Sequence, residues 1–158
     1  MQFRIGNGYD THPLLHGKSL ILGGVKIPSE KGIEGHSDGD VVIHSIIDSL
    51  LGAMAFKDIG THFPSSNPKY KNISSMKLLK EVLIILTEKK YKINNIDTTI
   101  LLEKPTLKKY INMMRKSIAN CLKINISQIS IKATTNDKLG FIGAGKGISC
   151  FATALIMK

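Results

Sequence analysis

The segment from Val41 to Met54 constrains the fold most strongly, because it is a long run of apolar, helix-compatible residues interrupted by one polar stripe. The residues before it read GHSDGD, in which an aspartate provides an N-cap and a glycine permits a tight entry into a helix. On a 3.6-residue period the apolar side chains cover a broad arc, which predicts a helix buried in the core. The polar stripe consists of Asp40, His44 and Asp48, whose spacing places them on one face of that helix.

His44, in the middle of this stripe, admits two interpretations. An imidazole with a carboxylate one helical turn away suits a metal ligand whose second ring nitrogen is held by an acid. The same arrangement suits a core histidine that is satisfied by a neighbouring aspartate. The choice between them depends on the rest of the chain.

A second group of possible ligands follows the N-terminal segment 3–9, whose alternation predicts a strand and whose glycines predict a close backbone approach. Asp10 and His12 are two residues apart, so they point to the same side of an extended chain. Pro13 is expected to end the strand. With His44 they form a set of one carboxylate and two imidazoles, which suits tetrahedral zinc with an open fourth position.

The remaining patterns predict one α+β domain over residues 1–158, in which a mixed sheet is covered by helices as a layered α/β sandwich. Beyond the first strand and the first helix, a second strand or a bent hairpin arm broken at Gly23-Gly24 is expected over 20–28. Further strands are expected over 96–102, 129–135 and 148–156, and helices over 75–88 and from 105 or 106 to 122. The predicted order is β-β-α-α-β-α-β-β. The segment 57–71 has two prolines and no periodicity, and we interpret it as a structureless, mobile lid.

Charge and cysteine content narrow the classes of partner. The net charge of +10 comes almost entirely from lysine, and aromatic residues make up only 6% of the chain. Nucleic-acid binding favours arginine and interleaved aromatics, so a small anionic substrate fits better. The isolated Cys121 and Cys150 suggest neither a disulfide framework nor a thiolate metal site, and they fit a reducing cytoplasm. The chain has no apolar run of membrane-spanning length, so no membrane partner is expected, and the stroma of an organelle fits if the chain is a trimmed form.

Two further segments are suited to phosphate. Asp137 follows paired threonines in a glycine-rich loop, where one carboxylate could hold Mg²⁺ together with substrate phosphates. His36 and Ser37 lie at the start of the first predicted helix, where donors and the helix dipole favour an anion. Two different cations together imply a diphosphate substrate. The chain offers phosphate-binding segments and metal ligands, but no Ser-His-Asp or Cys-His arrangement.

Four blocks of the chain carry a resemblance to a known family: GYDTH at 8–12, HSDGD at 36–40 with a histidine four residues on, DIG at 58–60 with FP at 63–64, and KATT at 132–135 followed by KLGF at 138–141. In order and separation they resemble the 2-C-methyl-D-erythritol 2,4-cyclodiphosphate synthases. The resemblance implies a phosphorus–oxygen lyase of non-mevalonate isoprenoid biosynthesis. In that reaction the 2-phosphate of 4-diphosphocytidyl-2-C-methyl-D-erythritol 2-phosphate attacks the β-phosphorus, and CMP leaves. It also implies a homotrimer with active sites between adjacent subunits.

The resemblance further implies roles for individual residues. The three-residue set of one aspartate and two histidines would hold one Zn²⁺ per subunit. Asp137 stands where the family has the glutamate that binds Mg²⁺ or Mn²⁺, and His36 and Thr135 correspond to stabilisers of the transition state. Substrate contacts are implied for Asp10, His12, Ser37, Asp58, Ile59, Gly60, Phe63, Leu102, Pro105, Leu107, Thr134, Asp137 and Phe141.

The chain also departs from the family. Ser65-Ser66-Asn67 replaces a common Asp-Thr-Asp, and Thr106 stands where many members have lysine. Ala144 and Lys146 replace a common Arg/Glu pair near the trimer axis. Two other classes of function remain open at this point: a basic nucleic-acid or nucleotide-binding module with a structural zinc, and a zinc hydrolase whose open fourth site activates water.

Overall fold

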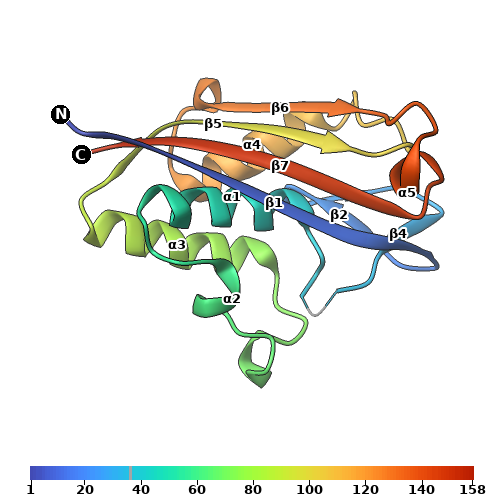
Figure 1. The fold of residues 1–158 in the computed structure, drawn as a ribbon, viewed down its shortest axis with the longest axis horizontal. Helices are drawn as coiled ribbons and strands as arrows, with labels where there is room; N and C mark the ends of the chain where they lie inside the picture. The colour runs from blue at the N-terminus through green and yellow to red at the C-terminus, as the bar shows by residue number, and fades with distance from the viewer. Residues whose placement is uncertain (36) are drawn as a thin grey trace.

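The computed structural model describes residues 1–35 and 37–158. The chain forms a mixed β-sheet with helices packed on one face (Figure 1). The main sheet contains β1 (Phe3–His16), β4 (Lys31–Ile33), β5 (Lys92–Leu101), β6 (Ile129–Thr134) and β7 (Gly147–Met157), and a separate hairpin contains β2 (Leu20–Leu22) and β3 (Val25–Ile27). The helices are α1 (Val41–Ala53), α2 (Ile59–His62), α3 (Ser75–Glu88), α4 (Ile111–Leu122) and α5 (Gly140–Gly143), with 3₁₀ turns η1 (Pro68–Tyr70) and η2 (Ile126–Gln128).

The strand order in the main sheet is β4-β1-β7-β5-β6. Its long central ladder is antiparallel and pairs Phe3 of β1 with Met157 of β7 and Pro13 with Gly147, so the two chain termini lie side by side. The pairing of β5 with β6 is parallel and is connected through α4. The predicted mixed sheet covered by helices, in a single small domain, is therefore confirmed.

Helix α1 is the centre of the core and lies directly against β1. Its apolar residues Val41, Ile43, Ile47 and Leu50 are fully buried. A methyl group added at Gly8 would lie 2.1 Å from the Ser45 carbonyl oxygen, so only a strand residue without a side chain allows this approach. The predicted close backbone approach at these glycines is confirmed.

The structure corrects four details of the predicted elements. β1 does not end at Pro13 but continues to His16, because at this point the strand changes its partner from β7 to β4. The short β4 was not predicted. Segment 20–28 is not one strand but the hairpin β2–β3, which turns at Gly23-Gly24, where the break was predicted. The lid segment 57–71 is not structureless, because it contains α2 and η1.

The third helix begins at Ile111 and not at residue 105 or 106. Leu107 is 3% exposed although it precedes the helix. The helical spacing of Leu107 with the later apolar residues therefore reflects its burial in the core and not a helical conformation. None of the helices found in residues 1–35 and 37–158 is long and apolar enough to cross a membrane.

Candidate metal centre and active site

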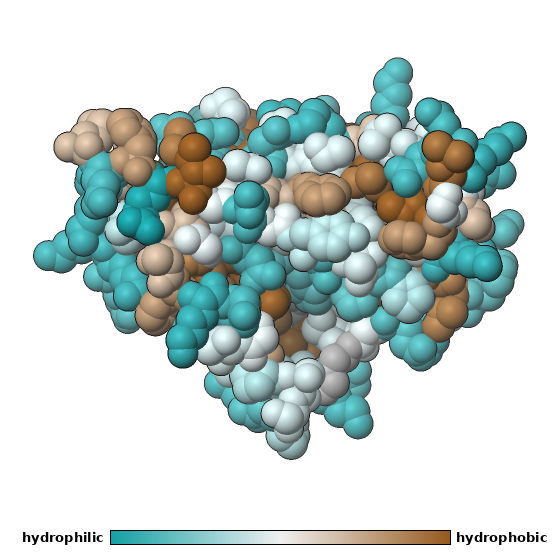
Figure 2. All heavy atoms as spheres, viewed as in Figure 1, coloured by the Kyte–Doolittle hydropathy of each residue, from teal (hydrophilic) through white to brown (hydrophobic). Residues whose placement is uncertain are grey.

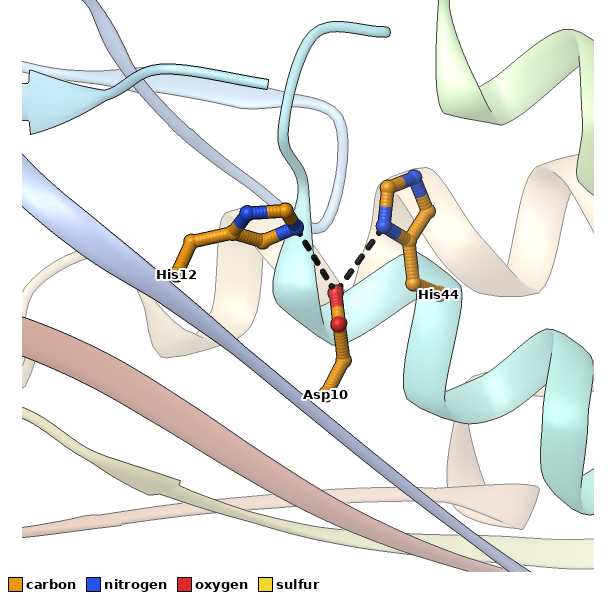
Figure 3. A group of neighbouring side chains, drawn as sticks. All are labelled: Asp10, His12 and His44. Carbon is orange, nitrogen blue, oxygen red and sulfur yellow. Dashed lines mark hydrogen bonds and ion pairs between the residues drawn. The ribbon is translucent and has the colours of Figure 1, made fainter. Parts of the chain in front are cut away.

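Asp10 and His12 of β1 and His44 of α1 converge at one point (Figure 3). Asp10 Oδ2 lies 2.9 Å from His44 Nδ1 and 3.3 Å from His12 Nε2. The possible ligand atoms of the three residues all lie within 4.8 Å of one another. Residues 10 and 12 share one side of the strand as predicted, and the contact of α1 with β1 brings His44 opposite them.

The electrostatics of this group favour a bound positive charge. Burial acts to raise the pKa of Asp10, but the hydrogen bonds and charges of the two histidines outweigh it and lower that pKa to about 2. Burial acts to lower the pKa of His44, but the hydrogen bond and negative charge of Asp10 outweigh it, so that pKa is raised. An ionised carboxylate therefore faces two imidazole nitrogens, and one carboxylate oxygen with two imidazoles is a donor set that fits zinc.

The acids on the helix of His44 do not hold its ring, contrary to the interpretation of the polar stripe. Asp40 is fully buried and accepts hydrogen bonds from the backbone N–H groups of Gly23, Gly24, Val42 and Ile43. Burial raises the pKa of Asp40 to about 6 against the effect of these donors. Asp48 accepts a hydrogen bond of 2.7 Å from Ile59 N and so holds the start of α2.

Hydroxyl groups contact the second ring nitrogen instead. His44 Nε2 lies 2.8 Å from Ser75 Oγ and 3.1 Å from Ser37 Oγ. The sequence analysis did not identify Ser75 as a site residue, because Ser74-Ser75 stands at the start of an amphipathic helix, where serine is a typical N-cap residue. The N-cap is Ser74, which makes no side-chain capping bond.

A cavity of about 250 Å³ opens beside Asp10, His12 and His44. Besides Asp10 and His12, four residues with implied substrate contacts line it: Ser37, Ile59, Gly60 and Phe63. The segment 57–71 therefore forms a wall of the site. Residues that line the cavity but were not predicted as contacts are Ser65, Tyr70, Ile73 and Leu78. Asp58 is exposed at the N-cap of α2 and accepts a 2.8 Å hydrogen bond from Thr61 N.

The other predicted site residues lie across the sheet. Asp10 pairs with Cys150, Cys150 with Ile100, and Ile100 with Ala133, so three strand spacings separate β1 from β6. At ~4.8 Å per spacing this is about 14 Å. Thr135 follows β6 by one residue, and its hydroxyl contacts Asp137 at 3.4 to 3.5 Å. Among the described residues that line the 250 Å³ cavity, none belongs to 134–141.

A second cavity of about 670 Å³ lies beside Pro105 and Thr106. Its walls also include Glu103, Lys104 and Ala144. The side chains of Leu102 and Leu107 are buried in the core, with exposures of 5% and 3%, so they anchor the segment 102–107 to the core beneath this cavity. Thr134 and Phe141 are exposed, and the predicted catalytic residue His36 lies outside the described residues.

The chain is similar in sequence to one family of known proteins. A profile of the YgbB family matches residues 3–157. The 2-C-methyl-D-erythritol 2,4-cyclodiphosphate synthase of Clostridium perfringens (strain 13 / Type A) is 54% identical over 155 residues, which cover 98% of this chain and 99% of that protein. The synthase of the same name from Bacillus subtilis (strain 168) is 50% identical over 156 residues, or 99% of each chain.

Solved structures show the same fold. A CDP complex of IspF from Plasmodium falciparum superimposes with a TM-score of 0.87 at 40% identity, covering 98% of this chain and 96% of that chain. The bifunctional IspDF from Campylobacter jejuni gives a TM-score of 0.94 at 37% identity. The match covers 98% of this chain but only 42% of the bifunctional protein.

Proposed function

Because the chain belongs to the YgbB family, we propose that the cavity beside Asp10, His12 and His44 is the active site of a metal-dependent 2-C-methyl-D-erythritol 2,4-cyclodiphosphate synthase. The enzyme is a lyase of isoprenoid biosynthesis. It cyclises 4-diphosphocytidyl-2-C-methyl-D-erythritol 2-phosphate to the 2,4-cyclodiphosphate and releases CMP. The convergence of the three ligands in a chain so similar to named synthases carries the proposal.

The reaction needs no protein nucleophile. An oxygen of the substrate's own 2-phosphate forms a bond to the β-phosphorus while the bond from that phosphorus to the CMP oxygen breaks. Catalysis therefore reduces to positioning and neutralisation of charge at phosphorus. Ser37 and the backbone of Ile59 and Gly60 lie on the cavity wall, where they can hold the substrate in a bent conformation.

We assign Asp10 Oδ2, His12 Nε2 and His44 Nδ1 as ligands of one Zn²⁺ per subunit. One carboxylate and two imidazoles fit this ion and leave a position for a phosphate oxygen. When bound, the ion would supply positive charge to the reacting phosphates. Asp137 is our candidate ligand for Mg²⁺ or Mn²⁺ bound with the substrate diphosphate. Thr135 and His36 are our candidates for stabilising the transition state.

The position of Thr135 and Asp137 supports a homotrimer with shared sites. About 14 Å of sheet separates them from the zinc ligands of their own chain, by the strand-spacing argument. The sheet face opposite the helices also exposes large apolar side chains: Phe3 is 56%, Ile5 70% and Phe151 52% exposed. Figure 2 shows hydrophobic residues gathered at both ends of the sheet among hydrophilic ones. Packing of three copies through this face would bury it and bring Thr135, Asp137 and Phe141 of one copy to the cavity of the next.

The cavity beside Pro105 is our candidate for the cytidine end of the substrate. Its lining residues differ from those of the cavity at Asp10, His12 and His44. A planar base bound there could pack against the ring of Pro105. Solved relatives bind CDP, as stated for the Plasmodium falciparum protein. We expect the enzyme in the bacterial cytoplasm, since both cysteines are free and buried.

Incubation of the zinc-loaded protein with the cytidine-diphospho substrate tests this function. The expected products are CMP and a cyclic diphosphate, followed by ³¹P NMR. Release of inorganic phosphate without a cyclic product would identify a hydrolase. A protein that binds zinc but releases no CMP would contradict the proposed function.

A further inference from the structure

The far side of the His44 imidazole contacts Ser75, which in turn is hydrogen-bonded to Asp38. Ser75, the first residue of α3, lies with its hydroxyl oxygen 2.8 Å from His44 Nε2. The same hydroxyl donates a hydrogen bond to Asp38 Oδ1 in the loop before α1, and Ser75 N donates to Asp38 Oδ2 at 2.9 Å. Ser75 is fully buried, and its hydroxyl contacts both the imidazole and the carboxylate.

The direction of these hydrogen bonds follows from the number of protons available. A carboxylate oxygen accepts, so the single hydroxyl proton of Ser75 is donated to Asp38. The Ser75 oxygen then offers only lone pairs to His44, and Nε2 must carry the proton in the hydrogen bond that joins them. With a proton held on Nε2, the ring nitrogen left to bind a metal is Nδ1, which in this structure is hydrogen-bonded to Asp10 Oδ2 at 2.9 Å.

We propose that Ser75 and Asp38 are positioning residues that fix the tautomer and the orientation of His44 for metal binding through Nδ1. This inference rests on the proposed metal site. A carboxylate that acts on a metal-bound histidine through a hydroxyl raises the basicity of the ring and restricts its rotation, and loss of such a partner typically weakens metal binding about 10- to 100-fold. Asp38 thus takes the role that the polar stripe assigned to an acid on the helix of His44 itself.

The arrangement also ties α3 to the metal site. Ser74 provides no side-chain capping bond, and the first backbone N–H of α3 is instead satisfied by Asp38. The backbone of Asp38 donates to Ile73 O at 3.3 Å. Substitution of Asp38 would therefore disturb the helix terminus as well as His44, whereas Ser75→Ala removes the hydroxyl and keeps the backbone contact.

Ser37 complicates a single substitution, because its hydroxyl lies 3.1 Å from the same Nε2 and could accept the proton after Ser75 is truncated. The experiment is therefore done in a Ser37→Ala background. The dissociation constant for Zn²⁺ is measured by chelator competition for the full-length wild type, Ser37→Ala, Ser37→Ala/Ser75→Ala and the matched control Ser37→Ala/Ser74→Ala. Visible absorption of the Co²⁺-loaded proteins reports ligand geometry, and thermal unfolding of the metal-free proteins reports the fold.

We expect Ser37→Ala/Ser75→Ala to bind Zn²⁺ 10- to 100-fold more weakly than Ser37→Ala, with a changed Co²⁺ spectrum, and the Ser74 control to match its background. A merely structural role would lower the unfolding temperature of the metal-free protein and leave both the Zn²⁺ affinity and the Co²⁺ spectrum unchanged, which would overturn the inference. Failure of the wild type itself to bind Zn²⁺ would instead overturn the metal site on which the inference depends.

Discussion

Replacement of Gly8 by alanine tests how strictly the contact of α1 with β1 controls the site. The added methyl carbon would lie 2.1 Å from Ser45 O, 2.9 Å from Ser49 N and 3.0 Å from Asp48 Cβ. An ordinary contact is at least about 3.4 Å, and two of the three atoms belong to the helix backbone, so the helix must shift by about 1 Å. His44 and Asp10 lie on the two elements that separate.

Overpacking of a core typically costs about 1–3 kcal/mol, and the backbone clash places Gly8→Ala at the upper end, about 3 kcal/mol. For a chain of this length that corresponds to an unfolding temperature lower by about 6–12 °C. A displacement of about 1 Å within a catalytic group can reduce turnover by about 100-fold, and we expect a similar loss in kcat/KM.

Gly52→Ala provides the matched control on the same helix. Its added methyl would come no nearer than 3.7 Å to any neighbour, which is an ordinary contact with Asn7 O. Alanine also favours the helical state over glycine, so we expect an increase in stability of about 0.5–1 kcal/mol and unchanged activity. Calorimetry of the metal-free proteins and steady-state kinetics measure both. If Gly8→Ala unfolds at the wild-type temperature with wild-type kcat/KM, then the close approach does not control the site.

Three further predictions concern charge, subunits and thiols. The pKa of Asp10 is about 2 in the folded protein against an ordinary value of 3.8, so its contribution to the stability of the metal-free protein is complete above about pH 4 and is lost as the pH falls to 2. The difference in unfolding free energy between wild type and Asp10→Asn should therefore fall by about 2 kcal/mol between pH 5 and pH 2. A difference that stays constant over this range would refute the prediction. Inactive His44→Ala and Thr135→Ala subunits, mixed equally and reassembled, should recover about a quarter of wild-type activity, because each site would combine the two residues from different copies; no recovery after proven subunit exchange would contradict shared sites. Burial raises the pKa of the Cys150 thiol to about 12, so it should stay unmodified by a thiol reagent at pH 8 until the protein is unfolded, whereas rapid native labelling would contradict its burial.

Much of the fold follows from local signals in the sequence. The apolar arc of residues 41–54 identifies a buried helix, and the glycines of the first strand indicate the close approach that the structure shows at Gly8. The convergence of Asp10 and His12 with His44 is also predictable, because strand alternation places the first two on one side. These features depend on the periodicity of one element or on the contact of two.

The features that escaped prediction depend on contacts between distant segments. Pro13 does not end its strand, because β1 gains a new partner in β4 that lies outside any local pattern. The second ring nitrogen of His44 is contacted by Ser75, which is 31 residues away, and not by an acid one turn along its helix. Spacing along a helix gives neighbouring Cβ positions, but it cannot show that Asp40 turns back to the N–H groups of Gly23 and Gly24.

The position of Thr135 illustrates the same limit for the site as a whole. Its motif follows the other motifs in order along the chain, yet the strand order β1-β7-β5-β6 separates it from Asp10, His12 and His44 of its own copy. The order of strands in a mixed sheet is set by long-range pairing, and the sequence pattern of a single strand does not show which strands it pairs with.

The metal content of wild type and His44→Ala tests the central claim most directly. His44 supplies one of three convergent ligands, and the apolar side chains around it remain in the variant to maintain the core. Elemental analysis after purification in the presence of zinc should find about one zinc per chain in the wild type and almost none in His44→Ala, with the same circular dichroism spectrum for both. A folded His44→Ala protein that retains one zinc per chain would contradict the assignment of this site.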